Sequence, residues 1–288
     1  MIIVKLMGRL GNQMFQYALA KRVETMGKDV AIDSSMLCYD QNHNELGIFP
    51  AIDIRVEEAT AQDVDKLGDC KKSLFCKAKR RIIGYKKTHV REQGYAYHPE
   101  IVDYDNVYLD GYWQTEKYFA DIKEKIRKLY TFPAICDKQN EQMAQRIQNS
   151  NSVSIHIRRG DYLSAKNAPM HGNICTKAYY DNAILYVSQQ IDHPQFFIFT
   201  DDAQWARSEY GNRPSYTIVD FNHESQSFRD MQLMSLCKHN ILANSSFSWW
   251  GAWLNENKDK LVVAPPKWFN LADTPDIWCD GWKIVEND

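Results

Sequence analysis

The sequence predicts an α/β protein in which two Rossmann-like halves face a cleft. Strands and helices alternate through the C-terminal half, the chain opens with the pattern strand, glycine turn, helix, strand, and its 288 residues have room for one large domain or two medium ones. Hydrophobic residues make up 44% of the chain and charged residues 25%, which is typical of a globular protein with buried cores. We place the boundary near residue 145, so that the halves cover 1–145 and 146–288.

The N-terminal half begins with a βαβ unit. Residues 2–6 form a short apolar run that ends at Gly8, which predicts a strand followed by a turn. From Gly11 to about residue 26 the apolar side chains recur at helical spacing, and residues 30–32 predict a second strand. Residues 40–100 show no regular pattern, so no element is predicted there.

A third strand is predicted at 107–109, directly before the segment 111–119. A charged amphipathic helix follows at 120–130, and Pro133 ends it. A second, polar helix at 137–149 leads into the C-terminal half.

The C-terminal half alternates strands with helices in a clear pattern. Five strands are predicted, at 152–157, 196–200, 216–219, 240–243 and 261–264. Helices are predicted between them, at 177–190, from Asp202, at 228–237 and from Ser246. This alternation is typical of a doubly wound parallel sheet.

Composition excludes several classes of protein. The formal net charge of −2 argues against a protein that coats nucleic acid, and no stretch approaches the roughly 18 apolar residues of a membrane span. The first residues do not predict a signal peptide. Seven cysteines are scattered without a C-x-x-C pair, which favours reduced thiols and a cytoplasmic location.

One cluster of charge stands out in the N-terminal half. Nine basic residues lie in a short stretch: Lys71, Lys72, Lys77, Lys79, Arg80, Arg81, Lys86, Lys87 and Arg91. The favoured interpretation is a solvated helix face. The alternative is peripheral contact with the inner face of a membrane, or with a polyanion.

The segment 154–162 carries the strongest chemical signal. Arg158 and Arg159 follow an alternating strand, at the edge of the sheet where open α/β sheets bind ligands. Two planar guanidinium groups suit a diphosphate, and Asp161 can hold one of them in place. The alternative is an Arg–Asp pair that only ties a loop to the sheet.

A second cluster covers residues 244–253, where a strand leads into a helix. Ser245 and Ser246 add two hydroxyls to the free N–H groups of the first helical turn, which makes a second anion site. Phe247 could stack on a flat base. The three tryptophans of this segment are interpreted as core: Trp249, Trp250 and Trp253.

Asp201 and Asp202 end a strand at the same edge of the predicted sheet. One carboxylate could accept two hydrogen bonds from guanine, and the alternative is a helix N-cap, a role that fits Asp202 in any case. No Asp, His or Glu array has the spacing of a metal site. We therefore expect arginine rather than a metal ion to meet phosphate charge, and no cofactor.

The turn 8–13 places glycines between the first strand and helix, so that backbone can approach a ligand and the helix N-terminus can face an anion. It matches neither a dinucleotide fingerprint nor a phosphate loop. Asn12 and Gln13 could donate to a sugar or phosphate, or could cap the helix. Together the clusters predict a cleft for a nucleoside diphosphate-linked group.

Four segments resemble the α-1,2-fucosyltransferases of glycosyltransferase family 11. They are H-x-R-R-x-D-Y at 156–162, N-S-S-F-S-W-W-G at 244–251, G-R-L-G-N-Q-M-F-Q-Y at 8–17 and G-Y-W-Q-T-E-K-Y-F at 111–119. The resemblance implies a GT-B fold, GDP-β-L-fucose as donor, and no metal. It also implies inversion at the anomeric carbon and an α-1,2 link to a galactoside, which could be an oligosaccharide or a lipid-linked glycan.

The resemblance also implies roles for single residues. Arg158 would contact the β-phosphate and the leaving oxygen, Asn12 would lie beside the fucose, and Asp202, with Asp201 as its rival, would read guanine. His156 and Arg159 would support the nucleotide or its loop. Three further residues resemble the segment that cradles the phosphates and packs on the nucleoside: Ser245, Ser246 and Phe247.

The catalytic base and the acceptor site are less defined by sequence. The candidates for the base are Asp161, Glu116 and His156, and a base could be dispensable if departure of the leaving group carries most of the barrier. The acceptor is expected against the N-terminal half, at a strand end that offers aromatic faces and hydroxyl-reading groups: Tyr112, Trp113, Gln114 and Glu116.

Two alternatives remain at this stage. One is another GDP-sugar or UDP-sugar transferase of the same fold. The other is a carbohydrate-binding module that uses its 8 Trp and 16 Tyr to stack on sugars, although such modules are usually β-sandwiches and the strand–helix alternation opposes this.

Overall fold

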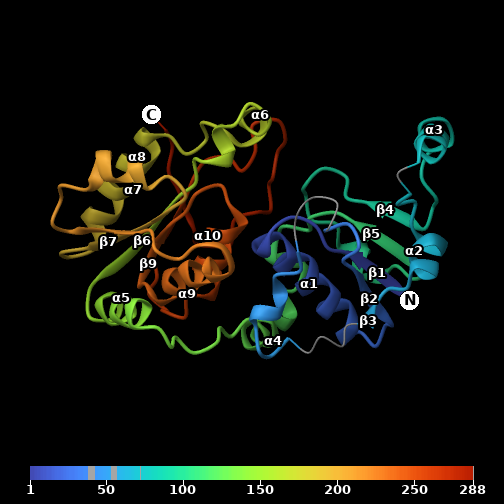
Figure 1. Ribbon diagram of the computed structural model, residues 1–288, viewed down its shortest axis with the longest axis horizontal. Helices are drawn as coiled ribbons and strands as arrows, with labels where there is room; N and C mark the ends of the chain where they lie inside the picture. The colour runs from blue at the N-terminus through green and yellow to red at the C-terminus, as the bar shows by residue number, and fades with distance from the viewer. Residues whose placement is uncertain (38–42, 53–56, 72, 288) are drawn as a thin grey trace. The chain divides into compact units, whose positions relative to one another are not determined.

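The computed structural model describes residues 1–37, 43–52, 57–71 and 73–287, and the chain divides into two compact units between Thr131 and Phe132. Each unit is built around its own parallel β-sheet (Figure 1). The predicted α/β class, with two Rossmann-like halves, is therefore confirmed within each unit.

Unit 1 contains a five-stranded sheet in the order β3-β2-β1-β5-β4, and all its pairings are parallel. Its strands are β1 (Ile2–Lys5), β2 (Val30–Asp33), β3 (Glu57–Glu58), β4 (His89–Arg91) and β5 (Val107–Asp110). The strands at both ends of this order, β3 and β4, come from the stretch where the sequence predicts no element. They are only two and three residues long, too short to show a period.

The helices of unit 1 are α1 (Leu10–Thr25), α2 (Ala61–Leu67), α3 (Leu74–Ile83) and α4 (Lys123–Leu129). Helix α1 packs along β1 and β2, while Leu67 of α2 joins Ile3 and Tyr108 in a small core on the sheet. Helices α2 and α3 also lie in the unassigned stretch. The sequence features that mark the starts of these helices are the N-caps Thr60 and Ser73. The hydroxyl of each accepts a hydrogen bond from the backbone N–H three residues later in the chain.

Unit 2 contains a six-stranded parallel sheet in the order β11-β10-β9-β6-β7-β8. Its strands are β6 (Ser152–Ile157), β7 (Gln195–Thr200), β8 (Tyr216–Val219), β9 (His239–Ile241), β10 (Val262–Ala264) and β11 (Lys283–Ile284). The five predicted strands are confirmed, and β6 and β8 have the predicted bounds. The sequence pattern did not predict β11, an edge strand of only two residues.

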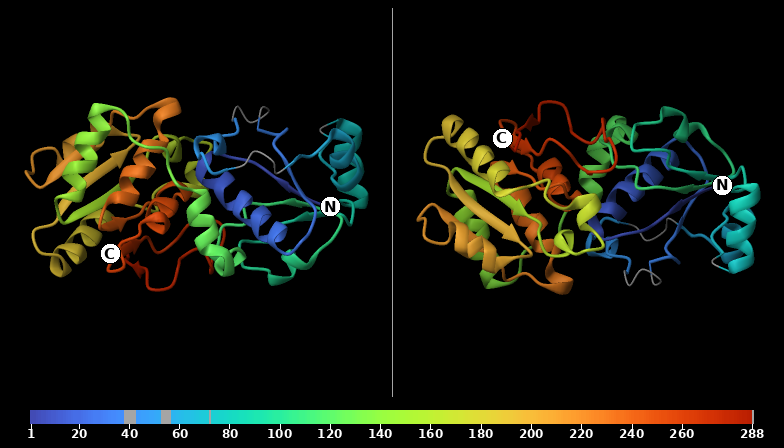
Figure 2. Two further views of the ribbon diagram at one scale, coloured as in Figure 1. Left: turned by 90° about the horizontal axis from the view of Figure 1, so that it is seen from below. Right: turned by 90° about the horizontal axis from the view of Figure 1, so that it is seen from above.

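Helices cover both faces of the unit 2 sheet (Figure 2). They are α5 (Lys138–Gln148), α6 (Ala168–His171), α7 (Lys177–Gln190), α8 (Ala203–Tyr210), α9 (Phe228–Leu236) and α10 (Ser246–Leu254). In one buried core, Val187 of α7 lies with Ile155 of β6. In the other, Leu233 of α9 lies with Phe197 of β7. The predicted core tryptophans are buried at 0%, 0% and 3% exposure: Trp249, Trp250 and Trp253.

The sequence-based boundary at residue 145 is wrong by about one helix. It falls inside α5, and α5 packs on α9: Met143 and Ile147 lie in the same buried cluster as Leu233 and Met234. Because these contacts join α5 to the C-terminal unit, the division comes before the helix.

Six described cysteines are not in a disulfide, and Cys38 lies outside the described residues: the six are Cys70, Cys76, Cys136, Cys175, Cys237 and Cys279. In the same part of the chain, no helix has both the length and the apolar character needed to cross a bilayer.

The order of strands creates one reversal in each sheet. In unit 2 the chain runs from β6 outward through β7 and β8, and then returns to the other side of β6 for β9, β10 and β11. In unit 1 the reversal lies between β1 and β5. The helical connections diverge at such a point, which opens the crevice where α/β sheets bind ligands.

Gly8, in the turn after β1, is needed for two reasons. Its backbone has φ of +74°, and a Cβ there would lie 2.3 Å from Nδ2 of Asn12. Gly27 has a similar φ of +78°, but a Cβ there would meet nothing within 4 Å. A substitution at Gly27 would therefore cause backbone strain alone, whereas one at Gly8 would add steric overlap with Asn12.

We expect Gly27→Ala to lower the free energy of unfolding by about 1 kcal/mol through left-handed strain alone. Gly8→Ala should cost about 2 kcal/mol or more, because the methyl group also displaces Asn12. Denaturant unfolding followed by tryptophan fluorescence measures both. Equal losses in the two variants would show that Asn12 moves freely and is not held at the turn.

Candidate functional site

Arg158 is the first residue after β6, at the switch point of the unit 2 sheet. Its Nη2 lies 2.8 Å from Oδ1 of Asp161, and its Nη1 lies 3.1 Å from Oδ2 of Asp201. Burial opposes the charge on Arg158, but the two carboxylates outweigh it and raise the pKa of the guanidinium. The expected hold of Asp161 on an arginine is present, and Asp201 adds a second hold.

Asp201 also shapes the turn that carries the arginines. Its Oδ1 accepts hydrogen bonds from the backbone N–H groups of Arg159, at 2.9 Å, and of Gly160, at 3.2 Å. With Arg158 on Oδ2, both oxygens of Asp201 are engaged. This carboxylate therefore joins the end of β7 to the turn after β6.

Asp202 has the N-cap role expected for it. It accepts a hydrogen bond of 3.1 Å from the backbone N–H of Trp205, and its other oxygen lies 3.2 Å from Nε of Arg159. The Arg159 guanidinium also lies 4.3 Å from the Trp205 ring centre. Guanine reading by Asp201 or Asp202 stays a prediction, and each carboxylate already has partners in this structure.

His156 lies within β6 and is buried. Burial, with the nearby charge of Arg158, lowers its pKa to about 3, so the imidazole is neutral. Its Nδ1 has no hydrogen-bond partner among the described residues, and its ring lies 5.7 Å from that of Phe247. A buried imidazole of such low basicity is a poor candidate for the catalytic base.

The segment after β9 lies beside the arginine turn. Ser245 caps α10 by accepting from the backbone N–H of Phe247, and Ser246 is the first residue of that helix. Tyr162 connects the two segments, because its hydroxyl donates to the backbone carbonyl of Asn244 over 3.2 Å. The predicted clusters at the ends of β6, β7 and β9 therefore lie together at one edge of the sheet.

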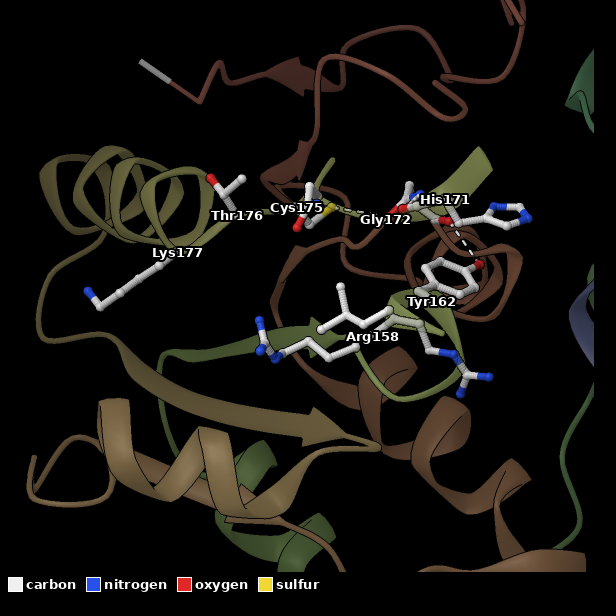
Figure 3. Close-up of a pocket in the computed structure, with 11 residues that line it drawn as sticks. Arg158, Tyr162, His171, Gly172, Cys175, Thr176 and Lys177 are labelled. Carbon is white, nitrogen blue, oxygen red and sulfur yellow. Dashed lines mark hydrogen bonds between the residues drawn. The ribbon is translucent and has the colours of Figure 1, made fainter. Parts of the chain in front are cut away.

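A pocket of about 190 Å³ opens beside the arginines (Figure 3). Arg158 and Tyr162 line it from the turn after β6. Six residues line it from the segment before α7 and the first residue of that helix: His171, Gly172, Asn173, Cys175, Thr176 and Lys177. This volume is below the roughly 300–1,000 Å³ of a complete small-molecule site, so the pocket can hold only part of a ligand.

Sequence reasoning predicted only Arg158 and Arg159 among the residues that line this pocket, and it missed three residues there that contact one another. The Tyr162 ring stacks on His171 at 4.7 Å, and burial raises the pKa of Tyr162 to about 12. The Nδ2 of Asn244 donates to the backbone carbonyl of His171 over 3.2 Å. Tyr162 and Asn244 were inside the quoted motifs, but nothing in the sequence marks His171, since its place depends on contacts across 73 residues of chain.

Among the residues that the structure describes, no three or more His, Cys, Asp or Glu side chains are grouped to hold a metal ion.

In unit 1 the two predicted segments meet at the other switch point. Nε2 of Gln114, after β5, donates to Oδ1 of Asn12, after β1, over 2.8 Å. Gln13 instead closes the turn, because its Nε2 donates to the Gly8 carbonyl over 2.9 Å and its Oε1 accepts from the Glu45 N–H over 2.9 Å. The side chain of Asn12, and not that of Gln13, therefore connects the turn after β1 to the loop after β5.

The N-terminus of α1 differs from the expectation that it faces a ligand anion. Oε2 of Glu45 accepts from the Leu10 N–H over 3.2 Å, and Oε1 lies 2.7 Å from Nε of Arg9. A carboxylate of the protein therefore already occupies this helix end.

Trp113 also differs from the prediction. It is 0% exposed, packs edge-on against Tyr118 at 5.8 Å, and has φ of +56°. A sugar cannot stack on a ring inside the core of the unit, so an acceptor contact by Trp113 is wrong in this structure. An aromatic residue after a strand fits either a core or a surface position, and only the packing decides.

The remaining acceptor candidates lie around Trp113. Tyr112 and Glu116 are partly exposed, whereas Gln114 is 8% exposed and bonded to Asn12. Glu116 begins a short helical turn that Thr115 caps. That these residues face the nucleotide site across a cleft stays a prediction.

Glu92, which the sequence analysis missed, holds this loop. Directly after β4, its two carboxylate oxygens accept from the N–H groups of Tyr112, at 2.6 Å, and Trp113, at 3.1 Å. Burial raises the pKa of Glu92 to about 7, and the two N–H donors oppose this rise only in part. Glu92 stands where no element was predicted, so its role was not visible in the sequence.

The comparisons with known proteins come from both sequence and structure. A model of Glycosyl transferase family 11 matches residues 1–285. The chain is 32% identical over 294 residues to an alpha-1,2-colitosyltransferase of Escherichia coli, covering 94% of this chain and 93% of the relative. It is 29% identical over 298 residues to the O-antigen biosynthesis glycosyltransferase WbnK of the same species, covering 96% and 98%.

Two more distant similarities are to the sequence of one fucosyltransferase and to the fold of another. Over 154 residues, 51% of this chain and 42% of the relative, it is 23% identical to galactoside alpha-(1,2)-fucosyltransferase 1 of Saimiri boliviensis boliviensis. The fold is similar to that of fucosyltransferase NodZ from Bradyrhizobium, with a TM-score of 0.50, 14% identity, and coverage of 87% and 91% of the two chains. The GT-B fold class implied by the resemblance is thereby confirmed.

Glu92 gives a prediction for the pH dependence of stability. Because its pKa rises from 4.5 in the unfolded chain to about 7 in the folded one, the folded state binds the proton more tightly. Stability from this group is complete below pH 4.5 and is lost as pH rises toward 7, by up to about 3 kcal/mol.

Glu92→Gln removes this titration. The difference in free energy of unfolding between the parent and the variant should therefore change by about 2 to 3 kcal/mol between pH 5 and pH 8, with the parent losing more. Asp230, whose pKa burial also raises to about 7, is present in both proteins and cancels. A pH-independent difference would mean that Glu92 is ionised throughout.

Proposed function

This chain belongs to glycosyl transferase family 11, and we propose that it transfers L-fucose from GDP-β-L-fucose to the 2-hydroxyl of a terminal galactoside. The reaction inverts the anomeric carbon and forms an α-1,2 linkage to an oligosaccharide or a lipid-linked glycan. The observation that carries the proposal is Arg158, which stands at the switch point of the unit 2 sheet and is oriented by two carboxylates.

The donor side of the mechanism rests on charge. As the acceptor oxygen forms a bond to the anomeric carbon and the β-phosphate oxygen leaves, negative charge grows on the diphosphate. A guanidinium has five N–H donors, so Arg158 can keep its two carboxylate partners and still donate to the leaving oxygen. The first turn of α10, with Ser245 and Ser246, supplies further donors for phosphate.

The acceptor hydroxyl must lose a proton during the transfer. We assign Asp161 to holding Arg158, since the two are paired, and Glu116 to the acceptor hydroxyl, since it lies partly exposed in unit 1. Asn12 and Gln114, joined at the unit 1 switch point, offer amide groups to the sugar hydroxyls. The proposal requires no resident metal or cofactor and no nucleic acid partner.

A second candidate function is transfer of colitose instead of fucose. It is favoured by the similarity to an alpha-1,2-colitosyltransferase at 32% identity across 94% of the chain. The same arginine and serine contacts would serve either donor, because they address the diphosphate and not the sugar.

Incubation with GDP-fucose and lactose tests the proposed function. We expect a fucosyllactose in which NMR shows an α-anomer attached to carbon 2 of galactose. A parallel incubation with GDP-colitose decides between the two donors by their kcat/KM. Attachment at another carbon, or release of GDP without transfer, would contradict the proposal.

The same assay tests independence from metal. The initial rate in excess chelator should agree within about twofold with the rate in Mg²⁺, a difference of about 0.4 kcal/mol in barrier. A large loss in chelator that Mg²⁺ restores would refute charge neutralisation by protein groups alone.

Arg158→Ala should lower kcat at least about 100-fold, since a charge-assisted contact to the leaving group is worth about 3 kcal/mol. Arg158→Lys should rescue little, because an ammonium cannot reproduce the planar fork. The matched control is Arg207→Ala, which removes an exposed arginine paired with Asp220 and should leave kcat unchanged. Near-normal turnover in Arg158→Ala would make this arginine structural.

Glu116→Gln should raise the acceptor KM or lower kcat while the affinity for GDP stays within about twofold, or about 0.4 kcal/mol. Trp113→Ala provides the contrast: loss of a fully buried tryptophan should cost about 3 to 5 kcal/mol of stability and affect both substrates alike. Calorimetry with GDP, acceptor kinetics and thermal unfolding separate the two patterns. Weakened GDP binding in Glu116→Gln would remove this residue from the acceptor site.

A further inference from the structure

Helix α3 and the turn that follows it form an exposed protrusion on unit 1. None of the ten residues of α3 is buried, and Figure 1 shows the helix standing clear of the unit 1 sheet. A helix of this length is marginal in water without a packing partner. Its sequence nevertheless favours the helix, with Ser73 as N-cap and a glycine, Gly84, at its end.

The protrusion has a fixed base. The backbone N–H of Lys86 donates to Oδ2 of Asp69 over 2.6 Å, which joins the two ends of the excursion. Nη1 of Arg80, on the inner side of the helix, donates to the carbonyls of Asp69 and Lys71, at 2.9 Å each. Tyr85 completes the base by stacking on His89 at 4.7 Å. The helix is therefore presented in a defined orientation.

The outer side of α3 is apolar. Four large side chains are almost fully in water: Leu74 is 85% exposed, Phe75 79%, Ile82 83% and Ile83 74%. At about 100° per residue, Leu74, Ala78, Ile82 and Phe75 fall within an arc of about 100°, and Ile83 lies about 80° beyond Phe75. Single exposed apolar residues are ordinary, but a contiguous group of this kind marks an interaction surface.

Basic side chains surround this apolar face. Lys77, Lys79, Arg81 and Lys87 are exposed, and within the described residues no ion pair joins any of them to a carboxylate. The sequence has no acidic residue between Asp69 and Glu92. Lys72, part of the predicted basic cluster, lies outside the described residues.

We propose that α3 and its following turn bind the surface of an anionic phospholipid bilayer. The helix lies in the plane of the membrane, with its apolar side among the acyl chains and its lysine and arginine groups at the phosphates. This combination of an apolar face and a basic rim is the physical signature of an interfacial helix. The inference is independent of the proposed function.

Two other occupants fit the surface less well. A nucleic acid offers phosphates for the basic groups but would leave four large apolar side chains in water. A second copy of the chain would cover the apolar side chains, but it would bring two sets of unpaired cations together, and like charges repel. Of these three occupants, a bilayer surface is the one that satisfies both features.

Sedimentation with lipid vesicles tests the proposal. The full chain should bind vesicles of phosphatidylcholine with 40% phosphatidylglycerol at least tenfold more strongly than vesicles of phosphatidylcholine alone, and sodium chloride at 0.5 M should weaken the binding. The double variant Phe75→Ser/Ile82→Ser should lose at least tenfold in partition to the anionic vesicles. The double variant Lys79→Glu/Arg81→Glu should lose as much.

Matched controls use exposed residues elsewhere. Leu185→Ser/Leu271→Ser removes two apolar side chains that are 58% and 70% exposed, and Lys125→Glu/Lys258→Glu inverts two exposed lysines. Both should bind vesicles like the parent. Circular dichroism and thermal unfolding confirm that each variant is folded, and transfer to a soluble acceptor should be unchanged in the α3 variants.

Three results would overturn the proposal. The first is no binding to anionic vesicles, and the second is binding that the α3 variants retain. The third is a concentration-dependent dimer, abolished by Phe75→Ser/Ile82→Ser, in a protein that does not bind vesicles, which would identify a second copy as the occupant.

Discussion

The reversal of strand order in two parallel sheets is the constraint on which the site depends. Parallel strands deliver all their following loops to one edge, and only at a reversal do neighbouring loops diverge to leave a crevice. In unit 2 the reversal separates β6 from β9, so the arginine turn and the Ser245 helix end lie on either side of it. In unit 1 it separates β1 from β5, where Asn12 meets Gln114 over 2.8 Å. In each unit, two motifs that are far apart in the sequence therefore become neighbours at the switch point of the sheet.

Charge balance explains how two arginines can lie side by side at the end of β6. Arg158 and Arg159 face three carboxylates, Asp161, Asp201 and Asp202, which fix their orientation and offset their repulsion. His156 adds no further positive charge, because burial and the neighbouring Arg158 hold its pKa at about 3. In the proposed function, this arrangement holds the arginine donors in place, so that little reorganisation is needed when negative charge develops on a leaving diphosphate.

The sequence predicts local structure well wherever the pattern is long. Strand β6 and helix α7 have their predicted bounds, because alternation marks the strand and Thr176 caps the helix. It fails for the short elements between residues 40 and 100 and for the two-residue β11. Within the site, it identified the residues at the strand ends but not Glu92 or the burial of Trp113, since both depend on contacts between β4 and the loop after β5. Tertiary packing decided these positions, and local sequence cannot report it.

Hydrogen exchange with and without GDP tests most directly the claim that the nucleotide binds at the switch point of unit 2. The account predicts that GDP slows exchange in peptides that contain residues 157–163, 200–203 and 244–248, at the carboxyl ends of β6, β7 and β9. Peptides at the opposite edge of the same sheet, around residues 150–152, 193–195 and 237–239, should exchange as before. Protection confined to that opposite edge, or to unit 1, would contradict the account.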